Sequence, residues 1–270
     1  MKSLKITLLI FSITITNYIS SNGLEEDFKE PTNILFWSNT QKEKWFKRID
    51  ELIPSLPINK GEYVYELKVN LLDLSTLSYN LYGKNYSITD YFLRSRVGGL
   101  LVVHKGDIVY ERYGLNNDKN SKWISFSIAK SVTSMLLGAA IKDGYIQNVE
   151  EPVTKYLPQL KGSSYEKVTI KNLLQMSSGV DWNEDYSDPR SDVSIAAAYN
   201  STSLINYLTK LPANASPGII FNYNTGETNL IGDLVRSAIK KSLSSYLEQK
   251  IWRPFGMENN ASWSVDEDHF

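Results

Sequence analysis

Two residues near the middle of the chain are spaced so that one could activate the other as a nucleophile. Ser127 and Lys130 stand three positions apart at the start of a helix predicted over residues 127–143. Side chains with this spacing lie on the same helix face, with their Cβ atoms roughly 5–6 Å apart. A serine hydroxyl is a weak nucleophile until a base takes its proton, and lysine serves as that base where its pKa is lowered. The pair predicts Ser127 as a nucleophile and Lys130 as its proton acceptor.

The Ser-x-x-Lys spacing alone is weak evidence, because it also occurs at residues 164–167 and 237–240. The first of these lies in a polar stretch, and the second lies near the end of an amphipathic helix. Only Ser127 opens a helix, follows the apolar and aromatic run at residues 123–126, and precedes an apolar helix that would bury it. The alternative is that Ser127 is only a helix N-cap and Lys130 a solvated lysine.

A tyrosine in a later extended segment is the third candidate for the site. Tyr223 comes just before a helix predicted over residues 226–240. A phenol beside a lysine ammonium can lose its proton more readily, take the proton of the serine, and later pass it to a leaving group. The alternative is that Tyr223 packs ahead of the helix while Asn224 caps it, with Glu227 as the capping-box partner. We expect Asn224 to cap the helix and assign Tyr223 to the site.

Composition argues against several other kinds of site. The chain has 270 residues, no cysteine, and two histidines, His104 and His269. A chain without cysteine has no disulfides, thiolate metal sites or cysteine nucleophile. His104 lies in a strand-like run and His269 is the penultimate residue, so no Ser-His-Asp triad is expected. No acidic loop has metal-ligand spacing, and we predict neither a metal nor a cofactor. The formal net charge of −1 provides no field for holding nucleic acid.

The N-terminus has the three-part layout of a secretory signal. A short basic lead at residues 1–5 is followed by an apolar run at 6–15 and by small residues up to Gly23. The apolar run is shorter than the roughly 20 residues of a membrane-spanning helix. We predict a signal peptide over residues 1–23 and a periplasmic or secreted protein, without stable membrane insertion after signal removal. An uncleaved N-terminal anchor is the alternative.

Strands are expected before helices along the rest of the chain. Residues 24–95 read as an N-terminal extension with an amphipathic helix at 41–53. Two β-prone runs on either side of a Lys-Gly-Asp turn predict a hairpin over residues 99–113. Apolar residues at three- and four-residue steps predict further helices over residues 127–143, 169–176, 226–240 and 242–252.

Four segments in order resemble the β-lactamase-related serine hydrolases. They correspond to the nucleophile helix, the helix and turn after it, the tyrosine box and the segment beyond, at residues 125–134, 168–179, 221–228 and 254–257. The nearest branch is the group of 6-aminohexanoate-dimer hydrolases and class C-like esterases. The resemblance implies an α+β fold over residues 96–270, with an antiparallel sheet packed on a mostly helical lobe. It also implies that Ser127, Lys130 and Tyr223 act together through an acyl-enzyme intermediate.

Two departures from the family pattern bear on substrate and activity. Thr225 takes the third position of the tyrosine box, where penicillin-cleaving members usually carry Asn and amide-dimer hydrolases a small hydroxyl residue. We therefore expect a small amide or ester as substrate rather than a β-lactam. The family closes its site with a later strand that carries a Lys or His box followed by Gly, and no Lys-Ser-Gly or Lys-Thr-Gly occurs here. We expect these late strands to be missing and the polypeptide by itself to be weakly active or inactive, unless another chain supplies the piece.

An acidic and aromatic loop at residues 180–189 supplies the last candidates. Trp182 and Tyr186, together with Thr225, are candidate substrate-binding residues, because a loop of this kind could roof the cleft. The alternative is a solvated connection with Trp182 packed on the core. Two other functions stay open for the chain as a whole: an inactive fragment or non-catalytic binding module of the same fold, and a β-lactamase or D-Ala-D-Ala peptidase.

Overall fold

Two long helices lie at the centre of the helical part of the protein. The computed structural model describes residues 33–197 and 201–266, so the predicted signal peptide and His269 lie outside the described residues. Helix α4 spans Ile128–Lys142 and helix α8 spans Thr225–Ile239, and the two pack against each other. Both bury the apolar face that their three- and four-residue spacing predicts, and Leu136 and Leu230 are completely buried.

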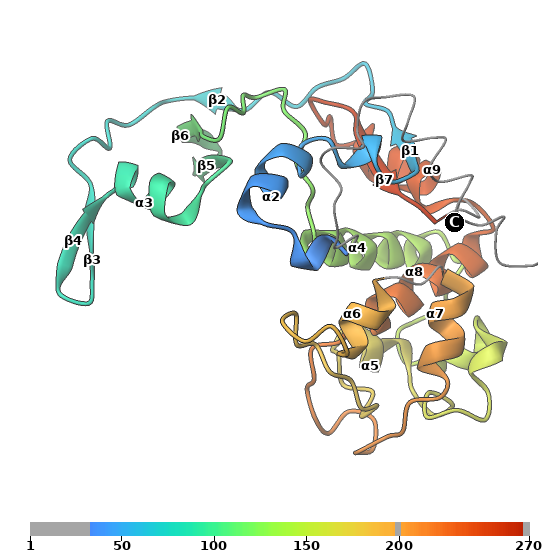
Figure 1. The fold of residues 1–270 in the computed structure, drawn as a ribbon. Coiled ribbons are helices and arrows are strands. Elements are labelled where there is room, and N and C mark those ends of the chain that lie inside the picture. The colour runs from blue at the N-terminus through green and yellow to red at the C-terminus, as the bar shows by residue number, and fades with distance from the viewer. Residues whose placement is uncertain (1–32, 198–200, 267–270) are drawn as a thin grey trace, which may run out of the picture.

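Shorter helices surround this pair, mostly below it in the view of Figure 1. They are α5 Ile170–Leu174, α6 Asp192–Ala196, α7 Ser201–Leu208 and α9 Leu243–Leu247, with a π-helical turn at Glu248–Trp252 and 3-10 turns at Val153–Lys155 and Pro158–Leu160. The helix predicted over residues 242–252 is therefore α9 continued by the π-helical turn. Together these elements bury one continuous apolar core.

The predicted hairpin is confirmed as strands β5 (Gly99–His104) and β6 (Asp107–Tyr113), which pair antiparallel. The turn between them places Lys105 and Gly106 at positive φ, a conformation that glycine adopts without strain. A third short strand, β2 (Lys68–Val69), pairs with β6 in parallel, which the sequence did not indicate. The order of this sheet is β2-β6-β5, and its strand β5 is largely exposed.

The remaining elements come from the two ends of the described chain. They are the antiparallel pairs β1 Ser55–Ile58 with β7 Ala261–Ser264 and β3 Ser78–Leu81 with β4 Lys84–Ser87, the helices α2 Asn39–Trp45 and α3 Ile88–Ser95, and the 3-10 turns Ile34–Phe36 and Ile49–Glu51. In Figure 1, β2 to β6 and α3 lie to one side, whereas β1, β7 and α9 lie together on the other side of α2. This mixture of sheets and a helical lobe confirms the predicted α+β class.

The helix predicted over residues 41–53 is shorter in the structure. Ser38 caps α2 through a capping box with Gln41, and the helix ends at the buried Trp45. The Phe46 carbonyl accepts a hydrogen bond from the Ile124 N–H at 2.9 Å, a contact from a distant segment. This tertiary contact takes the place of a further helical turn and ties α2 to the segment that leads into α4.

Candidate active site

The Ser127 hydroxyl is directed toward Lys130 rather than used to cap the helix. Ser127 occupies the N-cap position of α4 but has helical dihedral angles (φ −64°, ψ −9°), and its side chain makes no capping hydrogen bond. The Lys130 Nζ lies 3.5 Å from the Ser127 Oγ, within donating distance. Ser127 is exposed and Lys130 is half-buried. The positive end of the α4 dipole stabilises negative charge that develops on this oxygen.

Tyr223 also lies close to this amine. The Lys130 Nζ is 5.4 Å from the centroid of the Tyr223 ring, within the range of a cation–π contact. Tyr223 is half-buried in the extended segment before α8, whose N-cap is Asn224. The structure thus brings the three predicted catalytic residues together, because one amine lies near both the serine hydroxyl and the tyrosine ring.

The turn that leads into the nucleophile is held by an aromatic cluster. Phe126 has a φ of +45°, which an L-residue with a bulky side chain adopts only under constraint. Its ring packs edge-on against Phe46 at a centroid distance of 5.0 Å, and Trp123 contacts the same ring at 5.7 Å. The sequence shows the aromatic run but gives no sign of the strained residue, because the constraint comes from α2.

The other two Ser-x-x-Lys serines are engaged elsewhere. Ser164 Oγ donates to the Leu211 carbonyl at 2.7 Å, and Ser237 Oγ donates to the Tyr156 carbonyl at 2.9 Å. A hydroxyl bonded to a backbone carbonyl has its proton fixed away from any base. Of the three serines, only Ser127 combines exposure with a lysine contact.

A cavity of about 900 Å³ opens beside the Ser127–Lys130 pair. Tyr186 and Thr225 also line it, as do residues of β1 and β7. Its size is within the range of small-molecule sites. Trp182, in contrast, is buried with 4% of its surface exposed. Two of the three predicted substrate-binding residues therefore face the same space as the nucleophile candidate.

Comparison with known proteins identifies the family of the chain. Residues 92–269 match the sequence profile of the beta-lactamase family. The chain belongs to the beta-lactamase family. This is a family of hydrolases, and the resemblance stated from the four sequence segments is confirmed.

Individual relatives of this beta-lactamase-family chain are distant. It is 26% identical over 257 residues to the 6-aminohexanoate-dimer hydrolase of Paenarthrobacter ureafaciens. The matched region covers 89% of this chain and 62% of that enzyme. It is 21% identical over 187 residues to a beta-lactamase of Yersinia enterocolitica, and this match covers 65% of the chain and 45% of that protein. A solved structure of a candidate 6-aminohexanoate-dimer hydrolase from Bacillus anthracis has a TM-score of 0.76 at 21% identity, covering 90% of this chain and 68% of that one. The chain thus spans about six tenths of the length of the curated dimer hydrolase.

Sequence reasoning missed the carboxylate that organises the cavity wall of this beta-lactamase-family chain. Glu184 accepts hydrogen bonds from Trp182 Nε1, from the Tyr186 hydroxyl at 2.5 Å, and from both the backbone N–H (3.0 Å) and the hydroxyl of Thr225. The three predicted substrate-binding residues therefore share one acceptor. The only signal in the sequence was the acidic character of the loop, which does not single out one carboxylate.

A second carboxyl, Glu227, lies fully buried behind the tyrosine box. Ser178 Oγ donates to Glu227 Oε1, and Asn224 Nδ2 donates to the same oxygen at 3.4 Å. Burial raises the pKa of Glu227 to about 8. Asn224 Oδ1 accepts from the Glu227 N–H at 3.0 Å, so the predicted cap of α8 is confirmed. The Glu227 side chain, however, reaches to Ser178 rather than back to the N-cap backbone.

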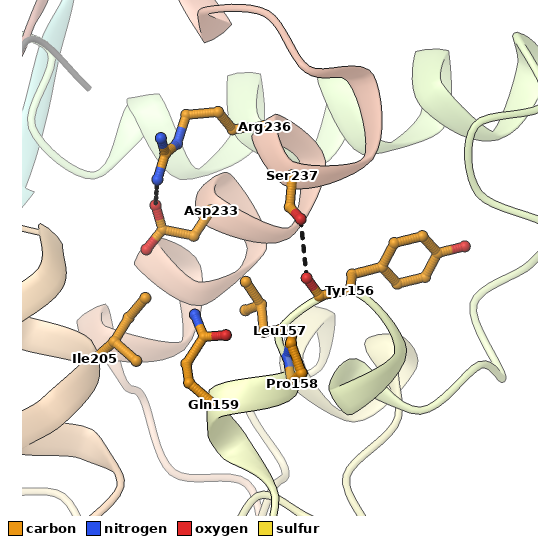
Figure 2. A pocket seen from close by; sticks show the side chains of 8 residues that line it. All are labelled: Tyr156, Leu157, Pro158, Gln159, Ile205, Asp233, Arg236 and Ser237. Carbon is orange, nitrogen blue, oxygen red and sulfur yellow. Dashed lines mark hydrogen bonds and ion pairs between the residues drawn. The ribbon is translucent and has the colours of Figure 1, made fainter.

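A smaller cavity of about 260 Å³ lies between α8 and the 3-10 turns, and Figure 2 shows its lining side chains. Arg236 pairs with Asp233 at 3.2 Å, and Ser237 is bound to Tyr156. These polar groups are engaged with one another and include no serine beside a base, so the larger cavity is the candidate site.

Among residues 33–197 and 201–266, no cluster of three or more His, Cys, Asp or Glu side chains could hold a metal ion. Within these ranges no helix has the length and apolar character needed to cross a bilayer.

Proposed function

We propose that this chain is a serine hydrolase that cleaves a small amide or ester through an acyl-enzyme intermediate. The observation that carries the proposal is the contact of one lysine amine with both other groups. Lys130 Nζ lies 3.5 Å from Ser127 Oγ and 5.4 Å from the centre of the Tyr223 ring. Such a chain of hydroxyl, amine and phenol moves protons without a histidine.

In this mechanism the Ser127 oxygen attacks the carbonyl carbon of the substrate while its proton passes to the Lys130 and Tyr223 pair. The tetrahedral intermediate then collapses, the bond to the leaving amine or alcohol breaks, and the leaving group takes that proton. An ester of Ser127 remains. Water gives a proton to the same pair as it attacks this ester. The pair then passes that proton to the Ser127 oxygen as the acyl C–O bond breaks, which releases the acid and restores the hydroxyl. The N-terminus of α4 supports the negative charge at each attack.

The substrate class that we propose is a linear amide of the 6-aminohexanoate-dimer type or a related ester. Two observations support it. The relative with 26% identity is named for that hydrolysis, and Thr225 supplies a small hydroxyl at the third position of the tyrosine box. A hydroxyl in place of an amide side chain makes a β-lactam less suitable as a substrate.

Covalent labelling with a fluorophosphonate probe tests the proposed chemistry. We expect labelling of the folded protein, its loss in Ser127→Ala, and its retention in Ser237→Ala. The last variant is a matched control, because Ser237 has the same Ser-x-x-Lys spacing but donates to the Tyr156 carbonyl. Labelling that persists in Ser127→Ala would refute the assignment of the nucleophile.

Other outcomes favour the alternative functions. A folded protein that takes up no probe would favour a non-catalytic binding module or inactive fragment. Stable acylation by a labelled penicillin would favour a D-Ala-D-Ala peptidase. Rapid cleavage of a chromogenic cephalosporin, with no turnover of 6-aminohexanoate-dimer amides, would favour a β-lactamase.

A further inference from the structure

The hydrogen bonds of Glu184 fix the direction in which two hydroxyl groups on the cavity wall can donate. A tyrosine or threonine hydroxyl has one proton to donate and lone pairs that accept. The Tyr186 hydroxyl gives its proton to Glu184 Oε1 at 2.5 Å, and the Thr225 hydroxyl gives its proton to the same oxygen. Both side chains line the cavity that contains Ser127. Neither hydroxyl has a proton left for a ligand.

The phenol of Tyr186 also stays protonated under ordinary conditions. Its burial, followed by its hydrogen bond to Glu184, raises the pKa of Tyr186 to about 12. The phenol therefore keeps its proton, and the negative charge of Glu184 keeps that proton directed away from the cavity.

The carboxylate is itself held in place on both oxygens. Glu184 Oε2 accepts from the Trp182 indole and from the Thr225 backbone N–H at 3.0 Å. Trp182 is buried, and its carbonyl accepts from Asn222 Nδ2 at 3.0 Å, which ties the acidic loop to the tyrosine box. A carboxylate held by four hydrogen-bond donors does not rotate away from the two hydroxyls, so the fold fixes the orientation of both hydroxyl groups.

We propose that Glu184 is a specificity-determining residue that makes this wall of the cavity accept hydrogen bonds but not donate them. The wall then selects substrates that present a donor there, an ammonium group above all, and disfavours substrates that present a carboxylate. The inference rests on the proposed hydrolase function of the same site, because a binding preference of the wall becomes a substrate specificity only if Ser127 acts on the bound ligand.

The size of the selection follows from the cost of an unmatched polar group. A substrate carboxylate that faces two accepting hydroxyls and a fixed negative charge loses its hydrogen bonds to water and gains none. We expect this loss to give a preference of roughly tenfold to a hundredfold for the ammonium over the carboxylate. Because the wall contacts the bound substrate rather than the reacting atoms, the preference belongs in KM more than in kcat.

Three p-nitrophenyl esters of similar length test the preference: the 6-aminohexanoate, the uncharged hexanoate and the adipate half-ester. We expect kcat/KM to fall in that order. The span, which is the ratio of kcat/KM between the first and the last ester, should be at least tenfold and should arise mainly from differences in KM. Glu184→Gln places an amide among the donors, which reorients the two hydroxyls and brings the span to within about threefold. The matched control is Asp185→Asn, which changes a neighbouring loop carboxylate that accepts from Ser187 at 2.7 and 2.8 Å, and this variant should keep the difference among the three esters.

Binding without turnover separates this inference from the proposed chemistry. In Ser127→Ala, NMR titration with 6-aminohexanamide and with adipic acid monoamide reports the same preference whether or not the protein hydrolyses anything. Tyr186→Phe and Thr225→Val, each of which removes one acceptor, should each reduce the preference and stand in for Glu184→Gln if that variant fails to fold. Equal binding of the two ligands, or a preference unchanged in all three wall variants, would overturn the inference.

Discussion

The helical lobe and the three-stranded sheet of this protein differ in how fully they cover their apolar side chains. In the lobe, α4 and α8 bury Leu136 and Leu230 completely. In the sheet, Leu101 and Val103 of β5 keep 52% and 46% of their surface exposed. Figure 1 shows the sheet strands β2, β5 and β6 set apart from the helices that form the lobe.

The proposed proton-transfer groups all stand on or beside the two central helices of the lobe. Ser127 and Lys130 open α4, and Tyr223 immediately precedes α8, so the packing of these two helices sets the distances among the three side chains. Close-packed interiors tolerate little displacement, which is what a proton relay requires. Changes at these positions and in the core of the lobe should therefore have large consequences, and matched changes in the sheet or at the exposed C-terminal end of α4 should have small ones.

The largest effect is expected from removing the shared amine. Lys130→Met keeps the length of the side chain but cannot take the Ser127 proton, and loss of a general base typically costs about 10²–10⁴ in rate. We expect kcat/KM for p-nitrophenyl hexanoate to fall by that factor while the thermal unfolding midpoint changes little. Lys142→Met, at the exposed end of the same helix, is the control. A decrease of less than threefold in Lys130→Met would remove Lys130 from the mechanism.

The second prediction compares the truncation of a buried leucine in the lobe with the truncation of an exposed leucine in the sheet. Leu136→Ala should lower the free energy of unfolding by about 2–5 kcal/mol, because it leaves a cavity in a filled core. Leu101→Ala removes the same atoms from an exposed position and should change the free energy of unfolding by less than about 0.5 kcal/mol. Urea denaturation of both variants measures the two values. A comparable loss in Leu101→Ala would mean that another surface covers β5 in solution.

The features that the sequence predicted are those governed by local spacing. The helical positions of Ser127 and Lys130 follow from a one-turn separation, and the cap at Asn224 follows from the residue types beside it. Contacts between distant segments were not accessible in the same way. The parallel pairing of β2 with β6 and the bonding of Tyr186 and Thr225 to the same Glu184 oxygen depend on how separate parts of the chain meet. Neither leaves a periodic or compositional trace.

The third effect concerns the buried carboxyl of the lobe. Burial raises the pKa of Glu227 to about 8, and its Oε2 atom has no hydrogen-bond partner among the described residues. In the unfolded chain, where the side chain is solvated, the pKa of the same group is the ordinary 4.5. Between these two values the folded state therefore holds a proton that the unfolded state releases. The free energy of unfolding should fall as the pH rises from about 4.5 to 8, because the folded state binds more protons there.

Glu227→Gln tests this dependence, because an amide has the shape of the protonated acid and does not titrate. We expect urea unfolding of the wild type to show declining stability from pH 5 to pH 8, and the variant to show a flatter profile over the same range. Stability near pH 5 should be similar in the two proteins, since the protonated acid and the amide can both accept from Ser178 and Asn224. Parallel profiles for the two proteins would show that Glu227 is already ionised in the fold, and that the covered lobe supplies this carboxylate with compensating donors.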